Sequence, residues 1–154
     1  MTRSTGLAKA TLLIASSVHL TVGMAQNSSE TAPPACPEAW EVASVHLYGT
    51  WQARWDGLSE PATLTLGRSP DYPDGLRGTL RRPAGQPPPE ALVAGDVDNG
   101  QFTLEESTDG RAITATWAGT FPQGACGKEI HGQWTDAATR TERAFMLRKL
   151  PGWR

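Results

Sequence analysis

Four Asx-Gly dipeptides divide the middle of the chain into short segments in which apolar and polar residues alternate. They are Asp56-Gly57, Asp74-Gly75, Asn99-Gly100 and Asp109-Gly110. Both kinds of dipeptide accept the positive φ angles of tight two-residue turns, and the twist of these turns matches that of antiparallel strands. Alternation with a period of two is the pattern of a strand that is buried on one face. The dipeptides therefore predict a series of β-hairpins.

The alternating segments between these turns predict a complete sheet. Eight of them are long enough to be strands: 46–55, 62–66, 76–81, 91–98, 101–106, 112–118, 128–135 and 143–149. The segment 82–90 contains Pro83 and the run Pro87-Pro88-Pro89, so it is predicted to be a stiff, exposed loop. Strands in an up-and-down order close most economically into a barrel, because closure removes exposed edges. The predicted fold class is all-β, an eight-stranded antiparallel up-and-down (meander) β-barrel.

Two of the turns predict a register between strands. A two-residue turn at Asn99-Gly100 places Asp98 opposite Gln101, Val97 opposite Phe102 and Gly95 opposite Leu104. The same rule at Asp109-Gly110 places Glu106 opposite Ile113, Leu104 opposite Ala115 and Phe102 opposite Trp117. Both hairpins agree on the buried face of the shared strand. Glu106 is the one polar residue on this otherwise apolar face, since it points inward between Val93 and Ile113.

The first 25 residues have the pattern of a cleavable signal peptide. Arg3 and Lys9 precede an apolar segment, and Gly23-Met24-Ala25 supplies small residues at the positions that direct cleavage. A retained anchor is less favoured, because the apolar segment is shorter than the roughly 20 residues that span a bilayer. We expect a signal peptide at 1–25, a flexible leader at 26–45, a barrel domain at 46–154 and no membrane span after cleavage.

Composition indicates the compartment and excludes one class of partner. Arginine greatly outnumbers lysine, and alanine, glycine and proline are plentiful, which is typical of a GC-rich bacterial genome. The expected location is therefore periplasmic or secreted. Removing Arg3 and Lys9 leaves 12 of the 14 basic residues against 16 acidic ones. This balance does not favour binding to nucleic acid.

The chain has two cysteines, Cys36 and Cys126. In an oxidising compartment they predict one disulfide that closes a loop of about 90 residues. A redox-active pair is the alternative, but the two residues lack the Cys-x-x-Cys spacing that tunes thiol reactivity. In the predicted barrel both cysteines fall at the same end, which favours the disulfide and the topology together.

The other end of the predicted barrel is the candidate binding site. It collects the loops 56–61, 83–90, 107–110 and 135–142. Alternation places five side chains inward there: Trp55, Arg82, Glu106, Trp134 and Arg143. Two indoles and a carboxylate between guanidinium groups would form a pocket with apolar walls and a few orienting charges, which suits a small, partly apolar ligand. The alternative is structural, with the tryptophans as core plugs and Glu106 in an ion pair with Arg82 or Arg143.

Two Gly-x-Trp motifs, Gly49-Thr50-Trp51 and Gly132-Gln133-Trp134, lie on the predicted first and seventh strands. A Gly-x-Trp on the first strand of an eight-stranded barrel resembles the calycins, the avidin-like and lipocalin-like families. The resemblance covers 47–150 in strand order and implies a barrel with a ligand mouth. Ala53 stands where biotin binders of this group carry a polar residue, so the resemblance does not imply biotin.

We find no catalytic motif, so we expect a protein that is not an enzyme and has no cofactor. Ser44 and His46 share a strand face without a third catalytic member. Glu129 and His131 form the best metal-ligand pair, but strand order separates them from His46, and we predict no metal site. Asp96 and Asp98 beside the Asn99-Gly100 turn are more typical of a solvated surface than of calcium ligands.

The sequence thus favours a small-molecule ligand, which predicts a cavity behind Trp55 and Trp134. The first alternative is a protein-binding module, such as an inhibitor of an envelope hydrolase. It would present the proline-rich loop and the loop 119–127, with Phe121-Pro122 as an exposed anchor. The second alternative is a structural protein of the cell envelope.

Overall fold

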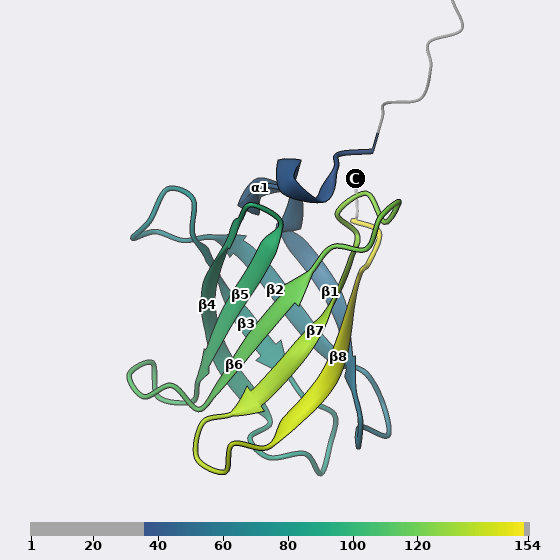
Figure 1. The fold of residues 1–154 in the computed structure, drawn as a ribbon. Coiled ribbons are helices and arrows are strands. Elements are labelled where there is room, and N and C mark those ends of the chain that lie inside the picture. Colours follow the sequence, from purple (N-terminus) through teal and green to yellow (C-terminus); the bar gives the residue numbers. More distant parts are fainter. Residues whose placement is uncertain (1–35, 153–154) are drawn as a thin grey trace, which may run out of the picture. The chain divides into compact units, whose positions relative to one another are not determined.

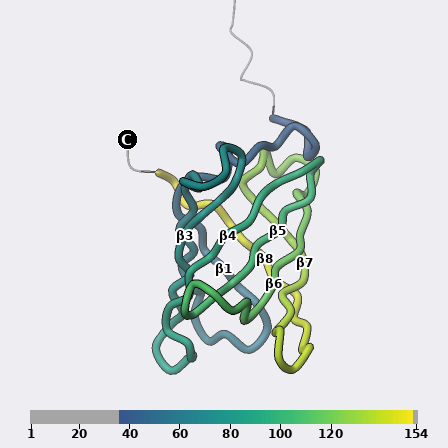
Figure 2. Tube along the Cα trace, turned by 90° about the vertical axis from the view of Figure 1, so that its left-hand side faces the viewer, coloured from purple at the N-terminus to yellow at the C-terminus, as the bar shows by residue number. Residues whose placement is uncertain are grey.

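The computed structural model describes residues 36–152, which form a closed antiparallel β-barrel (Figures 1 and 2). The strands follow chain order around the barrel: β1 Gly49–Trp55, β2 Ala62–Arg68, β3 Leu76–Arg81, β4 Glu90–Asp98, β5 Gln101–Ser107, β6 Ala115–Thr120, β7 Glu129–Asp136 and β8 Glu142–Lys149. β8 pairs with β1 and closes the sheet. The eight-stranded up-and-down barrel is confirmed. The predicted signal peptide and residues 26–35 of the predicted leader lie outside the described residues.

Alternating strand directions sort the loops into two ends. The end that we call the tryptophan end holds the loops 56–61, 82–89, 108–114 and 137–141. The opposite end, which we call the capped end, holds the loop 69–75, the turn 99–100 and the loop 121–128. Two short helices, η1 (Ala39–Glu41) and α1 (Ser44–Leu47), lie over the capped end, at the top of Figure 1. No helix within residues 36–152 is long and apolar enough to cross a membrane.

The segment before β1 differs from the prediction. Residues 44–47 form α1, so the first strand begins at Gly49 and not at 46. Backbone groups of this segment are bonded locally: Ala43 N donates to His46 Nδ1 (2.9 Å), and Trp51 Nε1 donates to the Leu47 carbonyl (2.8 Å). These bonds replace those that a strand partner would supply. Residues 36–45 of the predicted flexible leader therefore have a defined structure.

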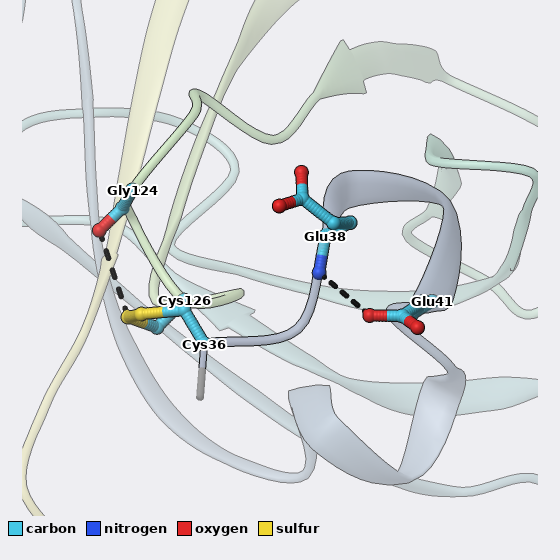
Figure 3. The surroundings of a disulfide bond; sticks show 5 residues. All are labelled: Cys36, Glu38, Glu41, Gly124 and Cys126. Carbon is cyan, nitrogen blue, oxygen red and sulfur yellow. Dashed lines mark hydrogen bonds between the residues drawn. A yellow bond between two sulfur atoms is a disulfide. The ribbon is translucent and has the colours of Figure 1, made fainter. Parts of the chain in front are cut away.

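The predicted disulfide between Cys36 and Cys126 is confirmed. It joins the segment before η1 to the loop between β6 and β7 at the capped end (Figure 3). Next to it, Glu38 N donates a hydrogen bond to Glu41 Oε2 (2.9 Å), which closes the turn of η1. The disulfide and this turn attach the start of the described chain to the barrel.

The two predicted hairpins have different outcomes. The register around Asn99-Gly100 is confirmed, with Asp98 opposite Gln101 and Gly95 opposite Leu104. The register around Asp109-Gly110 is wrong by two residues, since Glu106 lies opposite Ala115 and not Ile113. The reason is that Asp109 Oδ1 accepts hydrogen bonds from the backbone N–H groups of Arg111 (2.8 Å) and Ala112 (2.9 Å). This stabilises the seven-residue loop 108–114 instead of a two-residue turn.

Side chains fill the interior of the barrel. The largest of those that are almost completely buried are Trp51, Trp117, Phe102, Leu47, Leu64, Leu76, Leu80, Leu104, Ile130 and Leu147. Four inward strand positions are glycines: Gly78, Gly95, Gly119 and Gly132. A Cβ at any of them would come within 3.0 Å of a neighbouring backbone or side-chain atom. Neighbouring strands therefore approach closely at these positions, and the large aromatic side chains occupy the remaining space.

Phe121 is also part of this core, with 6% of its surface exposed. It continues the inward alternation of β6 after Ala115, Trp117 and Gly119. The prediction that Phe121-Pro122 presents an exposed anchor is therefore wrong. Burial of this ring excludes the Phe121 side chain as a docking group.

Candidate functional site

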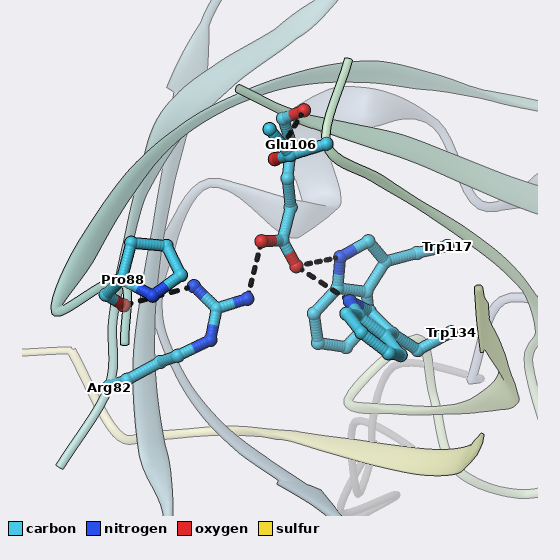
Figure 4. A network of polar contacts seen from close by, with 6 residues as sticks. Arg82, Pro88, Glu106, Trp117 and Trp134 are labelled. Atoms are coloured by element: carbon cyan, nitrogen blue, oxygen red, sulfur yellow. Dashed lines mark hydrogen bonds and ion pairs between the residues drawn. The ribbon is translucent and has the colours of Figure 1, made fainter. Parts of the chain in front are cut away.

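Glu106 is the centre of a buried polar network at the tryptophan end (Figure 4). Its side chain is 1% exposed. One carboxylate oxygen, Oε1, accepts hydrogen bonds from Trp117 Nε1 and Trp134 Nε1, both at 2.8 Å. The other, Oε2, forms an ion pair with Arg82 Nη2. Two oxygens thus accept three donors, one of them charged, which meets the requirements of a buried carboxylate.

Arg82 reaches Glu106 from the start of the proline-rich loop. Its side chain is 6% exposed. The backbone N–H of Arg82 donates to the Pro89 carbonyl (2.9 Å), and its guanidinium Nη1 donates to the Pro88 carbonyl (3.4 Å). Figure 4 shows the guanidinium between Pro88 and Glu106. The proline-rich loop is therefore folded back so that Arg82 closes this end of the barrel.

The tryptophans of this end are packed against one another. The Trp55 and Trp134 rings are nearly parallel, with centroids 6.4 Å apart, and Trp117 meets Trp55 edge-on at 5.4 Å. Arg82 Cζ lies 5.6 Å from the Trp55 ring centroid, and Arg143 Cζ lies 5.7 Å from that of Trp134. Both distances are in the range of cation–π contacts.

The structure thus brings together four of the five predicted site residues in one network of contacts: Trp55, Arg82, Glu106 and Trp134. Arg143 Cζ lies over the Trp134 ring, and its Nη1 donates to the Asp56 carbonyl (3.4 Å) rather than to Glu106. Sequence reasoning missed Trp117. The register error at Asp109-Gly110 placed this residue opposite Phe102, whereas it lies opposite Leu104. Two residues along a strand are about 7 Å, which is enough to separate Trp117 from Glu106.

The network has little capacity for chemistry with a substrate. The Glu106 carboxylate is occupied by its three donors, so it is not positioned as a general base. Glu106 lines a pocket of about 170 Å³ together with Leu92, Val93 and Ile113, and Trp55, Arg82, Trp134 and Arg143 are not part of its lining. Trp55 belongs to the buried core, and Trp134 packs against that core.

A second candidate site lies on the outer surface of the capped end. It is an open groove of about 710 Å³ between η1, the loop 69–75 and the end of β4, and we call it the Trp40 groove. Its side-chain chemistry is determined mainly by Trp40, Glu41, Tyr72, Asp74, Asp96 and Asp98. Trp40 is 68% exposed and Tyr72 is 72% exposed, the highest values among the large hydrophobic side chains of the described residues.

Hydrogen bonds hold the backbone segments that carry the two exposed rings. Trp40 lies in η1, where Glu41 N donates to the Glu38 carbonyl (2.9 Å) and the disulfide anchors the preceding segment. Tyr72 lies in a loop organised by Ser69, which is 5% exposed. Ser69 N donates to the Gly75 carbonyl (2.9 Å), and Ser69 Oγ accepts from Tyr72 N (3.3 Å). The two aromatic side chains are therefore presented to solvent by fixed supports.

A basic surface lies on another side of the capped end. Lys128 and Lys149 line a pocket of about 580 Å³ beside the disulfide. Lys149 Nζ donates to the His46 carbonyl and lies 5.8 Å from the Trp51 ring centroid. Burial, and secondarily the charge of Lys128, lower the pKa of the Lys149 ammonium. Glu41 lines both this pocket and the Trp40 groove, so the basic and the acidic surfaces of the capped end meet at this residue.

The remaining sequence motifs do not assemble into sites. Ser44 Oγ donates to the Asp74 carbonyl, and His46 Nδ1 accepts from the backbone, so the two side chains do not bond to each other. His131 Nε2 lies 3.6 Å from Glu129 Oε2 on the outer surface. Within residues 36–152, no three histidine, cysteine or acidic side chains come close enough to hold a metal ion.

Sequence reasoning did not assign a role to Trp40 or Tyr72. Trp40 fell in the predicted flexible leader, and Tyr72 fell in a loop that received no function. The available signal was the presence of an aromatic residue in each of two segments otherwise rich in proline and acidic residues. Compared with known proteins, the chain matches no family model and no curated protein sequence.

Proposed function

We propose that the protein is a non-enzymatic, exported binding module that docks another protein of the cell envelope in the Trp40 groove. The observation that carries this proposal is the pair of exposed aromatic rings, Trp40 and Tyr72, held on fixed supports at one groove. Tryptophan and tyrosine are enriched among the residues that dominate protein–protein binding energy. Inhibition of an envelope hydrolase is one activity that such a module could have.

Two further observations support docking on the outside of the barrel. The interior of the barrel holds a core of buried side chains, and the wall and loops offer exposed surfaces to a partner. Because the backbone around both rings is already bonded, binding would require little additional ordering of the module. A tryptophan that contributed only to folding would be expected inside the core, whereas Trp40 is exposed.

Site-specific photo-crosslinking tests this proposal. The photoreactive residue benzoylphenylalanine replaces Trp40, Tyr72 or, as a control, Ala138 in the loop at the tryptophan end, in cells that export the protein. We expect the same partner protein to be crosslinked from positions 40 and 72 and not from position 138. Absence of a crosslinked protein at both groove positions, or equal crosslinking at position 138, would overturn the proposal.

Recognition of a small, partly apolar ligand at the tryptophan end is the second candidate, as the calycin resemblance implies. The observation that favours it is the parallel pair Trp55 and Trp134, each with a guanidinium group over its ring. Entry would require the proline-rich loop to move, and the contact that holds Arg82 to Pro88 is long (3.4 Å).

Extraction of the purified, disulfide-bonded protein tests the second candidate. Organic extracts are examined by mass spectrometry, and tryptophan emission is recorded before and after extraction. A co-purified molecule whose removal shifts the emission would support ligand binding. An empty extract and an unchanged spectrum would contradict it.

Sequencing of the exported protein from its N-terminus tests the proposed cleavage after Ala25.

A further inference from the structure

The charged side chains that line the Trp40 groove are all acidic. Four carboxylates line it, from Glu41, Asp74, Asp96 and Asp98, and its lining contains no lysine, arginine or histidine. Within the described residues, none of these four carboxylates has an ion-pair partner. Asp96 Oδ1 accepts a hydrogen bond from Thr103 Oγ1 (2.7 Å), and Glu41 Oε2 accepts one from Glu38 N (2.9 Å). Three acidic residues elsewhere on the barrel surface have such partners, since Asp71 pairs with Arg77, Glu90 with Arg81, and Glu129 with Arg148, whereas Glu60, Glu105 and Glu142 have none within the described residues.

Two of these carboxylates follow the repeat of an extended chain. Asp96 and Asp98 are both exposed on β4, and Asp98 is the last residue of this strand before the turn that leads to β5. Residues separated by two positions on a strand point to the same side, about 7 Å apart. The same repeat separates alternate side chains of any extended peptide. A partner in that conformation could therefore place one basic side chain at each aspartate.

We propose that the Trp40 groove recognises an extended, basic protein segment in which lysine or arginine occupies alternate positions. Its cationic groups pair with Asp96 and Asp98, and the aliphatic parts of the basic side chains lie against the rings of Trp40 and Tyr72. Aromatic faces favour such cations as well as their apolar stems. The inference rests on the proposed docking function and specifies its partner.

The groove is less suited to other ligands. Anionic partners, such as nucleic acids and acidic membrane surfaces, would be repelled by four carboxylates. A neutral oligosaccharide would use the aromatic rings but would gain no ion pair. The volume of the groove, about 710 Å³, lies within the roughly 300–1,000 Å³ range of binding pockets. It is therefore large enough for a short peptide segment.

Peptide binding to the mature, disulfide-bonded protein tests the inference. The probe is a short fluorescein-labelled peptide in which lysine alternates with threonine, and its affinity is measured by fluorescence anisotropy. Two matched peptides serve as controls: one of the same composition with contiguous lysines, and one with glutamate in place of lysine. We expect the alternating peptide to bind at least about threefold more tightly than the contiguous one, and the glutamate peptide not to bind. Affinity should fall as salt increases from about 50 to about 200 mM.

Charge variants locate the binding. The double variant Asp96→Asn/Asp98→Asn should weaken binding of the alternating peptide by about fivefold to thirtyfold. The control Glu60→Gln/Glu142→Gln makes the same change in net charge at the tryptophan end, where both residues are exposed. It should change the affinity by less than about twofold, because distant surface charges are screened. Trp40→Ala should also weaken binding, while circular dichroism confirms that the barrel remains folded.

The outcomes separate this inference from the proposed function. Equal binding of the three peptides, or equal effects of the two double variants, would overturn the inference. It would also be overturned if a neutral oligosaccharide such as chitotetraose bound in a salt-independent way and the lysine peptides did not bind. Should positions 40 and 72 crosslink a partner while no basic peptide binds, docking stands and the basic segment is excluded. Failure of both experiments would remove both proposals.

Discussion

Glu106 is the residue on which we expect the tryptophan end to depend most. Its carboxylate accepts three donors, and Arg82 is almost completely buried with it. Glu106→Gln would remove the negative charge and turn an NH₂ group toward a donor. An uncompensated buried guanidinium is costly, so the free energy of unfolding should fall by about 3 to 5 kcal/mol. Urea unfolding followed by tryptophan fluorescence measures this change.

The neighbouring residue provides a matched control. Glu105 lies on the outer face of β5 and is exposed. Glu105→Gln makes the same chemical change and should alter stability by no more than about 0.5 kcal/mol. Similar losses in the two variants would show that the Glu106 network contributes nothing specific to folding.

At this scale, alternation was enough to predict that Glu106 points inward and that Trp55 and Trp134 lie near it. It could not predict which groups would bond to the carboxylate. Arg82 lies just beyond the end of β3, where strand alternation no longer constrains direction. Trp117 was missed because its position depends on the register of a different hairpin.

At the scale of the strands, the close approach of β6 and β7 predicts that a larger residue between them would destabilise the fold. Gly119 lies opposite Gly132, and a Cβ on Gly132 would overlap the Ala118 carbonyl oxygen and lie 2.6 Å from Gly119 Cα. Backbone atoms cannot move aside as a flexible side chain can. Gly132→Ala should therefore lower the free energy of unfolding by about 1 to 3 kcal/mol, measured by urea unfolding.

Gly67 on β2 offers the corresponding control. A Cβ there would meet the Arg77 carbonyl oxygen at 3.9 Å, which is ordinary contact. Gly67→Ala should be close to neutral or slightly stabilising, since alanine restricts the unfolded chain. If Gly132→Ala were tolerated equally well, the strands would not be as close as described.

The loop between β7 and β8 makes a pH-dependent contribution to the stability of the fold. Asp136 Oδ1 accepts hydrogen bonds from the backbone N–H of Thr139 (2.7 Å) and from its hydroxyl (3.0 Å). These bonds favour the charged form and lower the pKa of Asp136 below its usual value of 3.8. A carboxylate whose pKa is lowered in the folded state stabilises the fold when the pH is above the usual pKa. This stabilisation is lost as the pH falls through the lowered pKa.

The variant Asp136→Asn cannot titrate at this position. The stability difference between the natural protein and this variant should therefore shrink between about pH 5 and about pH 2. Urea unfolding midpoints across this range provide the measurement. A difference that stayed constant down to the lowest pH would contradict an ionised carboxylate as the stabilising group.

The turns show how far element boundaries can be predicted. At Asn99-Gly100 both residues have positive φ, 47° and 76°, as a tight hairpin turn requires. Asp109-Gly110 has the same signal in the sequence. There, however, the aspartate side chain bonds to the backbone of the next residues and stabilises a longer loop. A dipeptide alone does not distinguish these outcomes, because both use a glycine with positive φ.

At the scale of the whole molecule, the sequence contained enough to predict a closed barrel with both cysteines at one end. Strand number and alternating direction determine these features, and neither depends on an individual register. The cap of η1 and α1 was not predictable in the same way. Each helix is four residues long or shorter and is stabilised by contacts with the barrel rather than by a periodic pattern. The Trp40 groove, which depends on this cap, was therefore missed.

The disulfide connects the stability of the barrel to the Trp40 groove. Cys36 and Cys126 are separated by 90 residues, and in the chain-entropy model such a closure stabilises the fold by about 4 to 5 kcal/mol. The variant Cys36→Ser/Cys126→Ser should lose that amount, measured by urea unfolding.

This variant should also lose hydrogen-exchange protection at the N–H groups of Glu41 and Val42 in native buffer, because their segment is released, while the barrel strands stay protected. Release of η1 removes the fixed support of Trp40, so crosslinking from position 40 should fall more than crosslinking from position 72. An equal fall at both positions would show that the disulfide acts on overall stability alone.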